Sequence, residues 1–342
     1  MSTVTVQASR TYEVKIQRGI LDCVGQELSA IAKGQVFVVT DSIVASLYLA
    51  RVYQSLTAAG FRVFTASIPA GEASKNLEHY VNLLNLFAEK HLTRSDTVLA
   101  LGGGVVGDLA GFAAATFLRG IRLVQVPTTL LAMVDSSVGG KTAVDLSAGK
   151  NLVGAFHQPS LVLCDPEVLN SLSPEVFRDG CAEVIKTAIL FDPALFSHLQ
   201  AHGPDFDREY VITRCVECKR DVVCADEFDT GSRQLLNLGH TIGHAIEQLS
   251  GFCISHGSAV AMGTAIMARQ FCEKPQEIEG LLQQFGLPIR TTFSARLLAE
   301  AALSDKKRTG DTLTLVVPHA VGNCTLQKIL VAQLQSTIEA GL

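Results

Sequence analysis

Short apolar segments rich in β-branched residues alternate with helix-patterned segments over the first 165 residues of the 342-residue chain. The strand-like segments are 36–40, 60–67, 97–101, 123–127 and 161–164, and the stretch 77–89 has Leu, Val and Phe at helical spacing. Strands that alternate with helices usually form a mainly parallel sheet that helices cover on both faces. The sequence therefore predicts a Rossmann-like α/β domain over residues 1–165.

The pattern changes after residue 165. The stretches 175–190, 210–226, 235–249, 258–272 and 278–285 carry apolar residues at helical period, and 313–317 reads as a hairpin or edge strand. We expect a mostly α-helical second domain over residues 166–342.

Composition limits the classes of function. Apolar residues make up 48% of the chain and charged residues 18%, which is the balance of a folded protein. The 28 basic and 33 acidic residues give a net charge of −5 without a basic stripe, which argues against binding to nucleic acid or an anionic membrane. We see neither a secretory signal nor an apolar span of roughly 18 residues, and the nine cysteines are scattered. We therefore expect a cytoplasmic protein with reduced thiols.

A glycine-rich loop follows the third strand-like segment. Gly102, Gly104 and Gly107 fit the pattern G-x-G-x-x-G and lead into a helical stretch. Glycines let a backbone approach a pyrophosphate, and a helix N-terminus offers N–H donors to it. The pattern alone is weak evidence for a nucleotide, because no acidic residue follows about twenty residues later to bind a ribose. Asp41 is the better ribose candidate.

Three histidines lie within seventeen residues. His240 and His244 are four residues apart, and His256 comes sixteen residues after His240. Spacing alone would place His240 and His244 on one metal, as in H-E-x-x-H peptidases, but Thr241 stands where the catalytic glutamate of those enzymes would be. Because a catalytic zinc commonly has three His or Glu ligands, the cluster favours a metal site and disfavours a peptidase.

Glu183 interrupts an otherwise apolar helical stretch, and Lys186 follows one turn later. The two residues are open to two interpretations. They could form an exposed i,i+3 ion pair, or a buried functional pair, which their apolar surroundings favour.

Six segments together resemble the 3-dehydroquinate synthase family of sugar phosphate cyclases. They are 102–120, 126–145, 149–159, 182–188, 235–247 and 255–263, and the resemblance runs from about residue 41 to 307. Some of these motifs also occur in related cyclases. The looser two-domain plan is shared with metal-dependent polyol dehydrogenases such as glycerol dehydrogenase, so both classes are alternatives.

The resemblance implies NAD and a divalent metal, zinc or cobalt, as cofactors. It makes Glu183, His240 and His256 the metal ligands and His244 an acid–base group. The positions that match the family's NAD contacts are Asp41, Glu72, Lys75, Gly103, Gly104, Asp108, Thr128, Thr129, Asp135, Lys141 and Lys150.

Contacts with the phosphate and carboxylate of a substrate are implied in the same way. The matching positions are Arg119, Asp135, Lys141, Asn151, Lys186, Lys219, Arg233, Asn237, His244, Lys306 and Lys307. The catalytic residues among them would be His244, Lys141, Lys186, Asn151 and Arg233. Arg119 would reach the neighbouring subunit's site, which implies a homodimer. Asp229 stands where the family commonly has a glutamate, which leaves its role open.

The implied substrate is a small seven-carbon keto-acid phosphate, 3-deoxy-D-arabino-heptulosonate 7-phosphate, and the implied product is 3-dehydroquinate, the first carbocycle of the shikimate pathway. The implied reaction is NAD-dependent oxidation, β-elimination of phosphate, re-reduction and intramolecular aldol closure. A non-enzymatic module that binds zinc and a nucleotide would leave the cations at positions 141, 186, 219 and 233 unexplained.

Overall fold

The computed structural model describes residues 2–304, 308–309 and 311–342, which fall into two compact units. Unit 1 comprises Met1–Leu172 with Arg208–Phe228, and unit 2 comprises Ser173–Asp207 with Asp229–Leu342. The first segment of unit 1 ends seven residues after the boundary expected at residue 165. The division also differs in one helix, α8 (Arg208–Ala225), which returns to unit 1 because it packs against the first strand of that unit.

Unit 1 is built on a seven-stranded sheet, and within its described strands the only antiparallel pair is β1 with β2. In order across the sheet, the strands are β1 (Ser2–Gln7), β2 (Thr11–Ile16), β9 (Leu161–Cys164), β6 (Arg122–Pro127), β5 (Thr97–Gly102), β3 (Gln35–Asp41) and β4 (Arg62–Ile68). The central strands β3 and β5 are buried on both faces, which is why their sequences are nearly unbroken apolar runs.

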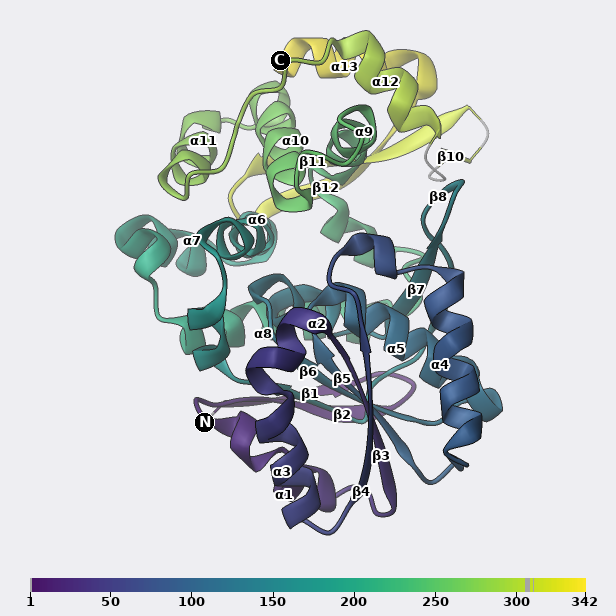
Figure 1. The fold of residues 1–342 in the computed structure, drawn as a ribbon. Helices are drawn as coiled ribbons and strands as arrows, with labels where there is room; N and C mark the ends of the chain where they lie inside the picture. The colour runs from purple at the N-terminus through teal and green to yellow at the C-terminus, as the bar shows by residue number, and fades with distance from the viewer. Residues whose placement is uncertain (1, 305–307, 310) are drawn as a thin grey trace. The chain divides into compact units, whose positions relative to one another are not determined.

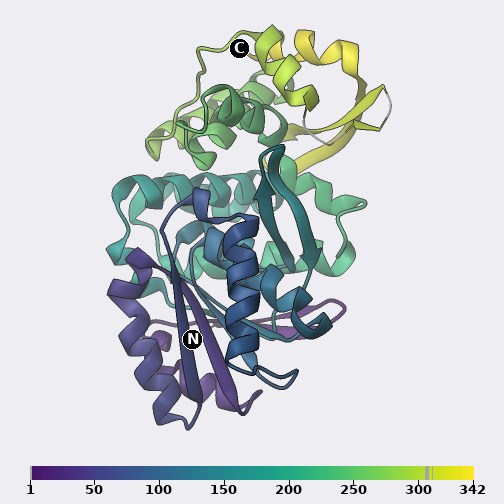
Figure 2. The ribbon, with the colours of Figure 1, turned by 45° about the vertical axis from the view of Figure 1, so that its right-hand side comes forward.

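Helices cover both faces of this sheet. Figures 1 and 2 show α4 (Leu77–Glu89) on one side of β3 and β4, with α1 (Val24–Ser29) and α3 (Ala50–Ala58) on the other. The short α2 (Ser42–Val44) begins directly after β3, and α5 (Gly104–Thr116) follows β5. Buried side chains of α4, α5, β3 and β5 form one core. The predicted α/β fold with a mainly parallel sheet is confirmed.

A two-stranded sheet in unit 1 has no counterpart in the sequence prediction. β7 (Lys141–Leu146) and β8 (Gly149–Phe156) form an antiparallel hairpin, which Figure 2 shows as a long ribbon. The hairpin packs on α5 at Gly111, where a Cβ would lie only 2.5 Å from Thr142 Cγ2. Lys150 and Asn151, two of the predicted binding residues, belong to β8.

Unit 2 is mostly helical, which confirms the prediction. Its helices are α6 (Pro174–Phe191), α7 (Pro193–His202), α9 (His240–Leu249), α10 (His256–Phe271), α11 (Pro275–Gln284), α12 (Ala295–Ser304) and α13 (Leu334–Gly341). The predicted segment 313–317 lies in β11 (Thr312–Ala320), which pairs antiparallel with β10 (Arg308–Thr309) and β12 (Asn323–Leu330). Within the described residues, no helix has both the length and the apolar character needed to cross a bilayer.

The helix predicted over 235–249 is interrupted. A 3-10 helix, η8 (Ser232–Asn237), ends two residues before Gly239, and α9 begins at His240. Gly239 has a φ of 75°, and a Cβ there would lie 2.6 Å from the carbonyl oxygen of Val260. The break therefore needs glycine for both its left-handed backbone and its close approach to α10. It makes His240 the first residue of α9.

Candidate active site

Helices α6, α9 and α10 of unit 2 approach one another almost backbone to backbone. A Cβ on Gly257 of α10 would lie 2.1 Å from the carbonyl oxygen of Asp179 in α6, and a Cβ on Gly243 of α9 would lie 3.1 Å from the carbonyl of Ala259. The Asp179 carboxylate also accepts a hydrogen bond from the backbone N–H of Ser258 at 3.2 Å. Because these glycines place no side chain between the helices, functional residues from all three can meet.

Glu183 of α6, His240 of α9 and His256 of α10 meet at this contact. Their donor atoms all lie within 4.8 Å of one another, and Glu183 Oε1 is 3.6 Å from His240 Nε2 and 3.5 Å from His256 Nε2. Glu183 is 1% exposed and Lys186 is 2% exposed, and the ammonium of Lys186 contacts Glu183 Oε2. Of the two interpretations of the Glu183–Lys186 pair, the structure contains the buried one.

A divalent metal fits these three residues. Neither oxygen of Glu183 accepts a hydrogen bond of regular geometry from the described residues, and an ionised carboxylate buried in this way needs nearby positive charge. Lys186 supplies positive charge at Oε2, while Oε1 faces the two imidazole nitrogens. One carboxylate and two imidazoles form a donor set typical of catalytic zinc, which keeps a further position for water or substrate.

The other ring nitrogen of each histidine also has a partner. His240 Nδ1 lies 3.0 Å from the carbonyl oxygen of Leu238, and His256 Nδ1 lies 3.1 Å from a carboxylate oxygen of Glu247. A carbonyl only accepts, so the neutral His240 ring carries its proton on Nδ1 and leaves the Nε2 lone pair for a metal. Burial opposes charge on the His256 ring, but the carboxylates of Glu183 and Glu247 outweigh it and raise the pKa of His256 to about 10. The cluster therefore attracts cations.

His244 lies one turn after His240 on α9, with the two ring centres 5.5 Å apart. It does not share the donor set of Glu183 and His240, and it groups instead with Glu247 and His256. The arrangement that spacing alone suggests, His240 and His244 on one metal, is thus not the one found in the described part of the chain. His244 lies beside the donor set, with its ring centre 6.1 Å from that of His256.

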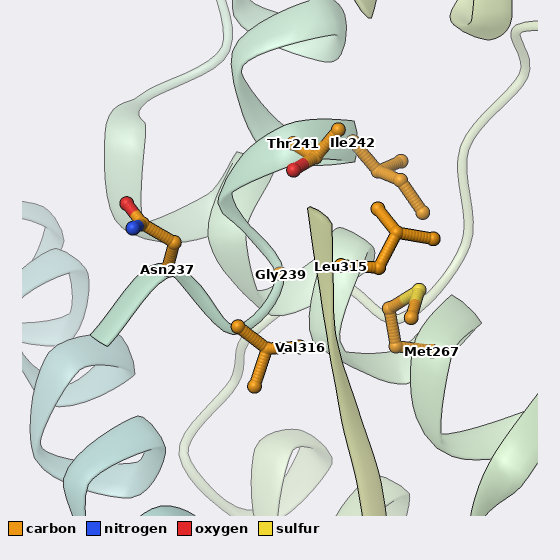
Figure 3. Close-up of a pocket in the computed structure, with 7 residues that line it drawn as sticks. All are labelled: Asn237, Gly239, Thr241, Ile242, Met267, Leu315 and Val316. Carbon is orange, nitrogen blue, oxygen red and sulfur yellow. The ribbon is translucent and has the colours of Figure 1, made fainter. Parts of the chain in front are cut away.

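Arg233 and Asn237, two predicted substrate residues, belong to η8. Arg233 is 1% exposed, and Asn237 donates a hydrogen bond from Nδ2 to the carbonyl of Gln234 at 3.1 Å. A cavity of about 10 Å³ next to Asn237 is lined by Gly239, Thr241, Ile242, Met267, Leu315 and Val316 (Figure 3). The Asn237 amide points away from the apolar side chains of this cavity (Figure 3), which has room for about one water molecule and none for a substrate.

In unit 1, the glycine loop lies at the carboxyl end of β5, where α5 begins. A Cβ on Gly103 would lie 3.0 Å from Thr129 Cγ2, and a Cβ on Gly107 would lie 2.9 Å from Gln125 Oε1. No described side chain caps the N-terminus of α5, which is 13 residues long. Its first N–H groups therefore have no side-chain cap among the described residues, which fits a pyrophosphate.

Buried hydroxyl groups lie at the same edge of the sheet. Thr128, directly after β6, is 2% exposed, and its N–H donates to the carbonyl of Gly102 at 3.0 Å. Thr40, at the carboxyl end of β3, is fully buried. Among the described residues, the Oγ1 atoms of Thr40 and Thr128 have no hydrogen-bond partner. Such orphaned hydroxyls fit a polar ligand at this edge, and Thr40 is a candidate that the sequence prediction missed.

Four of the predicted NAD residues form one ion-pair network. Lys75 Nζ lies 3.0 Å from Asp108 Oδ2 and 3.5 Å from Glu72 Oε1, and Lys150 Nζ lies 3.9 Å from Glu72 Oε1. Asp145, which the prediction missed, adds a third carboxylate 3.9 Å from Lys75. Burial would lower the pKa of Lys75, but these carboxylates outweigh it and raise that pKa. Burial also raises the pKa of Asp108, against the opposing charge of Lys75.

Asp145 also fixes the strand that carries Asn151. Its Oδ1 accepts a hydrogen bond from the N–H of Asn151 at 2.8 Å, and its own N–H donates to the carbonyl of Lys75 at 2.8 Å. Asn151 has a φ of 55°, which is uncommon for a residue other than glycine and is held here by this bond. Asp145 therefore links two predicted binding segments, although the sequence predicted no role for it.

Lys219 of α8 contacts both the side chain and the backbone carbonyl of Asp135. The prediction gives Lys219 and Arg233 the same ligand, but Lys219 belongs to unit 1 and Arg233 to unit 2. Lys141 is the exposed first residue of β7. The Oγ1 of Thr129 accepts a hydrogen bond from the backbone N–H of Ala132 at 3.2 Å.

The remaining predicted residues lie at turns. Asp41 caps α2 by accepting hydrogen bonds from two backbone N–H groups at 2.9 and 3.0 Å. Arg119 and Asp229 have left-handed backbones, with φ of 66° and 59°. Lys306 and Lys307 lie outside the described residues.

Comparison with known proteins covers nearly the whole chain. Models of the 3-dehydroquinate synthase N-terminal and C-terminal families match residues 65–179 and 180–308. A 3-dehydroquinate synthase from Latilactobacillus sakei is 40% identical over 99% of this chain and 98% of its own. A crystal structure of 2-deoxy-scyllo-inosose synthase with carbaglucose-6-phosphate, NAD+ and Co2+ has a TM-score of 0.89 and 26% identity, over 100% of both chains. A solved structure of 2-epi-5-epi-valiolone synthase from Streptomyces hygroscopicus with NAD+ and Zn2+ bound has the same TM-score and identity, over 99% of this chain and 97% of that one. The chain belongs to the 3-dehydroquinate synthase family.

Proposed function

We propose that this chain is a 3-dehydroquinate synthase, which converts 3-deoxy-D-arabino-heptulosonate 7-phosphate to 3-dehydroquinate and phosphate. The observation that carries the proposal is the buried Glu183–His240–His256 donor set with Lys186 against it, in a chain that matches both parts of the family. Identity supports this member of the cyclase group, because it is 40% with the synthase from Latilactobacillus sakei and 26% with the two cyclases of other sugar phosphates.

Glu183, His240 and His256 would hold the divalent metal, zinc or cobalt, in unit 2. When bound, the ion supplies Lewis acidity, which makes a neighbouring substrate hydroxyl easier to deprotonate. The helix contacts at Gly243 and Gly257 keep the three donors together without a side chain between them. The role of the protein at this point would be to hold that hydroxyl in a fixed orientation next to His244, whose imidazole would accept its proton and later return it.

Unit 1 would bind NAD at the carboxyl edge of its parallel sheet. The cradle at Gly103 and Gly104 receives the pyrophosphate, and the hydroxyls of Thr40 and Thr128 offer hydrogen bonds at the same edge. When bound, NAD supplies reversible hydride transfer, so that oxidation of the substrate is transient. The network around Lys75 holds the loop of Glu72 in place beside this edge.

Cationic and amide side chains would bind the two anionic ends of the substrate. Lys141, Lys186 and Asn151 would bind the phosphate, and Arg233, with Asn237 one turn beyond it, would bind the carboxylate. Arg233 suits a carboxylate because its guanidinium can donate two parallel hydrogen bonds, whereas a lysine donates as a point charge. A carboxylate can accept both of these hydrogen bonds and a neutral hydroxylated carbon cannot, and this favours the keto-acid phosphate over a sugar phosphate without a carboxylate.

The proposal also covers the oligomeric state and the cellular compartment. Arg119 would enter the site of a second copy, so that the enzyme acts as a homodimer. The nine cysteines are thiols, which supports a reducing compartment, the cytoplasm.

Substrate selectivity tests the proposal. We expect turnover of the keto-acid phosphate and essentially none of glucose 6-phosphate or sedoheptulose 7-phosphate. Arg233→Ala should lower kcat/KM for the acid by about 100-fold or more, which corresponds to roughly 3 kcal/mol at the transition state. Arg233→Lys, which keeps the charge and loses the fork, should recover only part of that loss. Comparable turnover of either sugar phosphate, or an Arg233→Ala enzyme of unchanged efficiency, would refute the assignment.

A further inference from the structure

Glu247 is a buried acid outside the proposed donor set. It lies on α9 and is 4% exposed, and its Oε2 is 3.1 Å from Nδ1 of His256 on α10. Burial of an ionised carboxylate is unfavourable unless hydrogen bonds and nearby positive charge offset it. The contact with His256 therefore accounts for an acid at a position where helical spacing would place an apolar residue.

The two ring nitrogens of His256 face carboxylates from two different helices. Nε2 lies 3.5 Å from Glu183 Oε1, on the side of the donor set, and Nδ1 lies 3.1 Å from Glu247. A carboxylate accepts, so a neutral His256 ring that faces Glu247 carries its proton on Nδ1 and directs its Nε2 lone pair to the donor set. Glu247 thus selects the tautomer and the ring orientation that a metal at Nε2 requires.

His240 provides an internal comparison. Its Nδ1 faces the neutral carbonyl of Leu238, at 3.0 Å, whereas the Nδ1 of His256 faces a carboxylate. A charged acceptor forms a stronger hydrogen bond than a neutral one and raises the basicity of the ligating nitrogen more. We infer that Glu247 is a positioning residue, which fixes the Nδ1–H tautomer of His256 and strengthens the bond from its Nε2 to a divalent metal. The inference rests on the proposed function, in which Glu183, His240 and His256 hold the ion.

The same side chains also admit a different arrangement. His244, Glu247 and His256 form a second group whose donor atoms lie within 4.8 Å of one another. An ion held there through Nδ1 of His256 would displace the proton through which this ring donates a hydrogen bond to Glu247, so the two roles exclude each other. The number of ions bound per chain and the tautomer of His256 distinguish a Glu247 that accepts a hydrogen bond from a Glu247 that binds an ion.

Zinc affinity of the purified full chain tests the inference. The protein is stripped with a chelator and titrated with Zn2+ against a chromophoric competitor, in wild type, Glu247→Gln and Glu247→Ala. Glu279→Gln is the matched control, because Glu279 pairs with Arg269 in the same unit and outside the cluster. We expect one ion per chain, a Kd raised about 10–100-fold in Glu247→Gln and more in Glu247→Ala, and no change in the control. The visible spectrum of the Co2+ form should change only in the two Glu247 variants.

Two outcomes overturn the inference alone: zinc affinity within twofold of wild type in Glu247→Gln, or two ions in wild type of which the variant loses one. Failure of the wild-type chain to bind zinc would overturn the proposed function together with it. If the variants do not fold, nitrogen NMR of the zinc-loaded wild type decides. We expect both zinc-bound imidazoles to carry their proton on Nδ1, and a zinc-bound His256 protonated on Nε2 would refute the role of Glu247.

Discussion

Gly257→Ala should separate helices α6 and α10 and thereby destroy the proposed metal site. The added Cβ would lie 2.1 Å from the carbonyl oxygen of Asp179 and 2.7 Å from its Oδ1. The carbonyl belongs to the backbone of α6, so it cannot relieve the clash by a side-chain rotation. Overpacking of this kind costs about 1–3 kcal/mol. The hydrogen bond from Ser258 N–H to Asp179, at 3.2 Å, would also be lost, at about 0.5–1.5 kcal/mol.

The substitution also has a favourable effect, because alanine stabilises a helix by about 0.5–1 kcal/mol relative to glycine. The net expectation is a loss of about 1–3 kcal/mol in the free energy of unfolding. Relief of the clash needs a displacement of about 1 Å at the residue next to His256, whereas metal–ligand distances tolerate only about 0.2 Å. Zinc affinity should therefore fall together with stability.

Urea unfolding and chelator competition measure the two effects. Gly280→Ala is the control, because Gly280 lies inside α11 and a Cβ there would meet open space, with no atom of another described element within 4 Å. That variant should be more stable than wild type by about 0.5–1 kcal/mol, with unchanged zinc affinity. If Gly257→Ala were as stable as Gly280→Ala and bound zinc as tightly as wild type, the close helix contact would not be what assembles the donors.

Three further changes have definite expected outcomes. His256→Ala should copurify with far less zinc than wild type, whereas His244→Ala should keep its zinc and lose turnover. Elemental analysis measures the zinc and a phosphate-release assay measures turnover, and equal loss of metal in both variants would contradict the ligand set. Lys75→Met removes the buried cation beside the carboxylates of Asp108, Glu72 and Asp145, so the free energy of unfolding should fall by about 3–5 kcal/mol. An unchanged midpoint of urea unfolding would show that the network does not stabilise the fold. Burial would raise the pKa of Asp96, but hydrogen bonds from neighbouring N–H and hydroxyl groups outweigh it and lower that pKa. Its contribution to stability is therefore present above about pH 4 and lost as pH falls through the lowered pKa, and Asp96→Asn should flatten the acid limb of stability against pH.

The parts of the fold that local pattern determines could be predicted. Strands β3 and β5 are unbroken apolar runs because both of their faces are buried, and that signal lies within the strand itself. The placement of α8 in unit 1 and the β7–β8 hairpin could not be predicted from local pattern, because both depend on contacts with segments that are remote in the sequence. The break at Gly239 was also missed, since a glycine in a helical pattern does not reveal that α10 approaches it within contact distance.

The site shows the same division. The spacing of His240 and His244 describes one helix face, but the residue that completes the donor set, Glu183, comes from another helix and was assigned by resemblance. Glu247 and Asp145 were missed because each acts through a partner that the fold brings to it, His256 for the first and Lys75 for the second. Sequence pattern therefore identified residue types suited to the chemistry, and the tertiary contacts identified which of them meet.

Phosphate release from 3-deoxy-D-arabino-heptulosonate 7-phosphate, measured together with NADH absorbance, tests the proposed reaction most directly. With zinc-loaded wild-type protein and NAD far below the substrate concentration, we expect many equivalents of phosphate and 3-dehydroquinate per NAD, and no net NADH, because the hydride returns to the same substrate. Glu183→Ala provides the matched blank. Steady accumulation of NADH in proportion to product would place the enzyme with the polyol dehydrogenases, and the absence of phosphate release would contradict the proposed function.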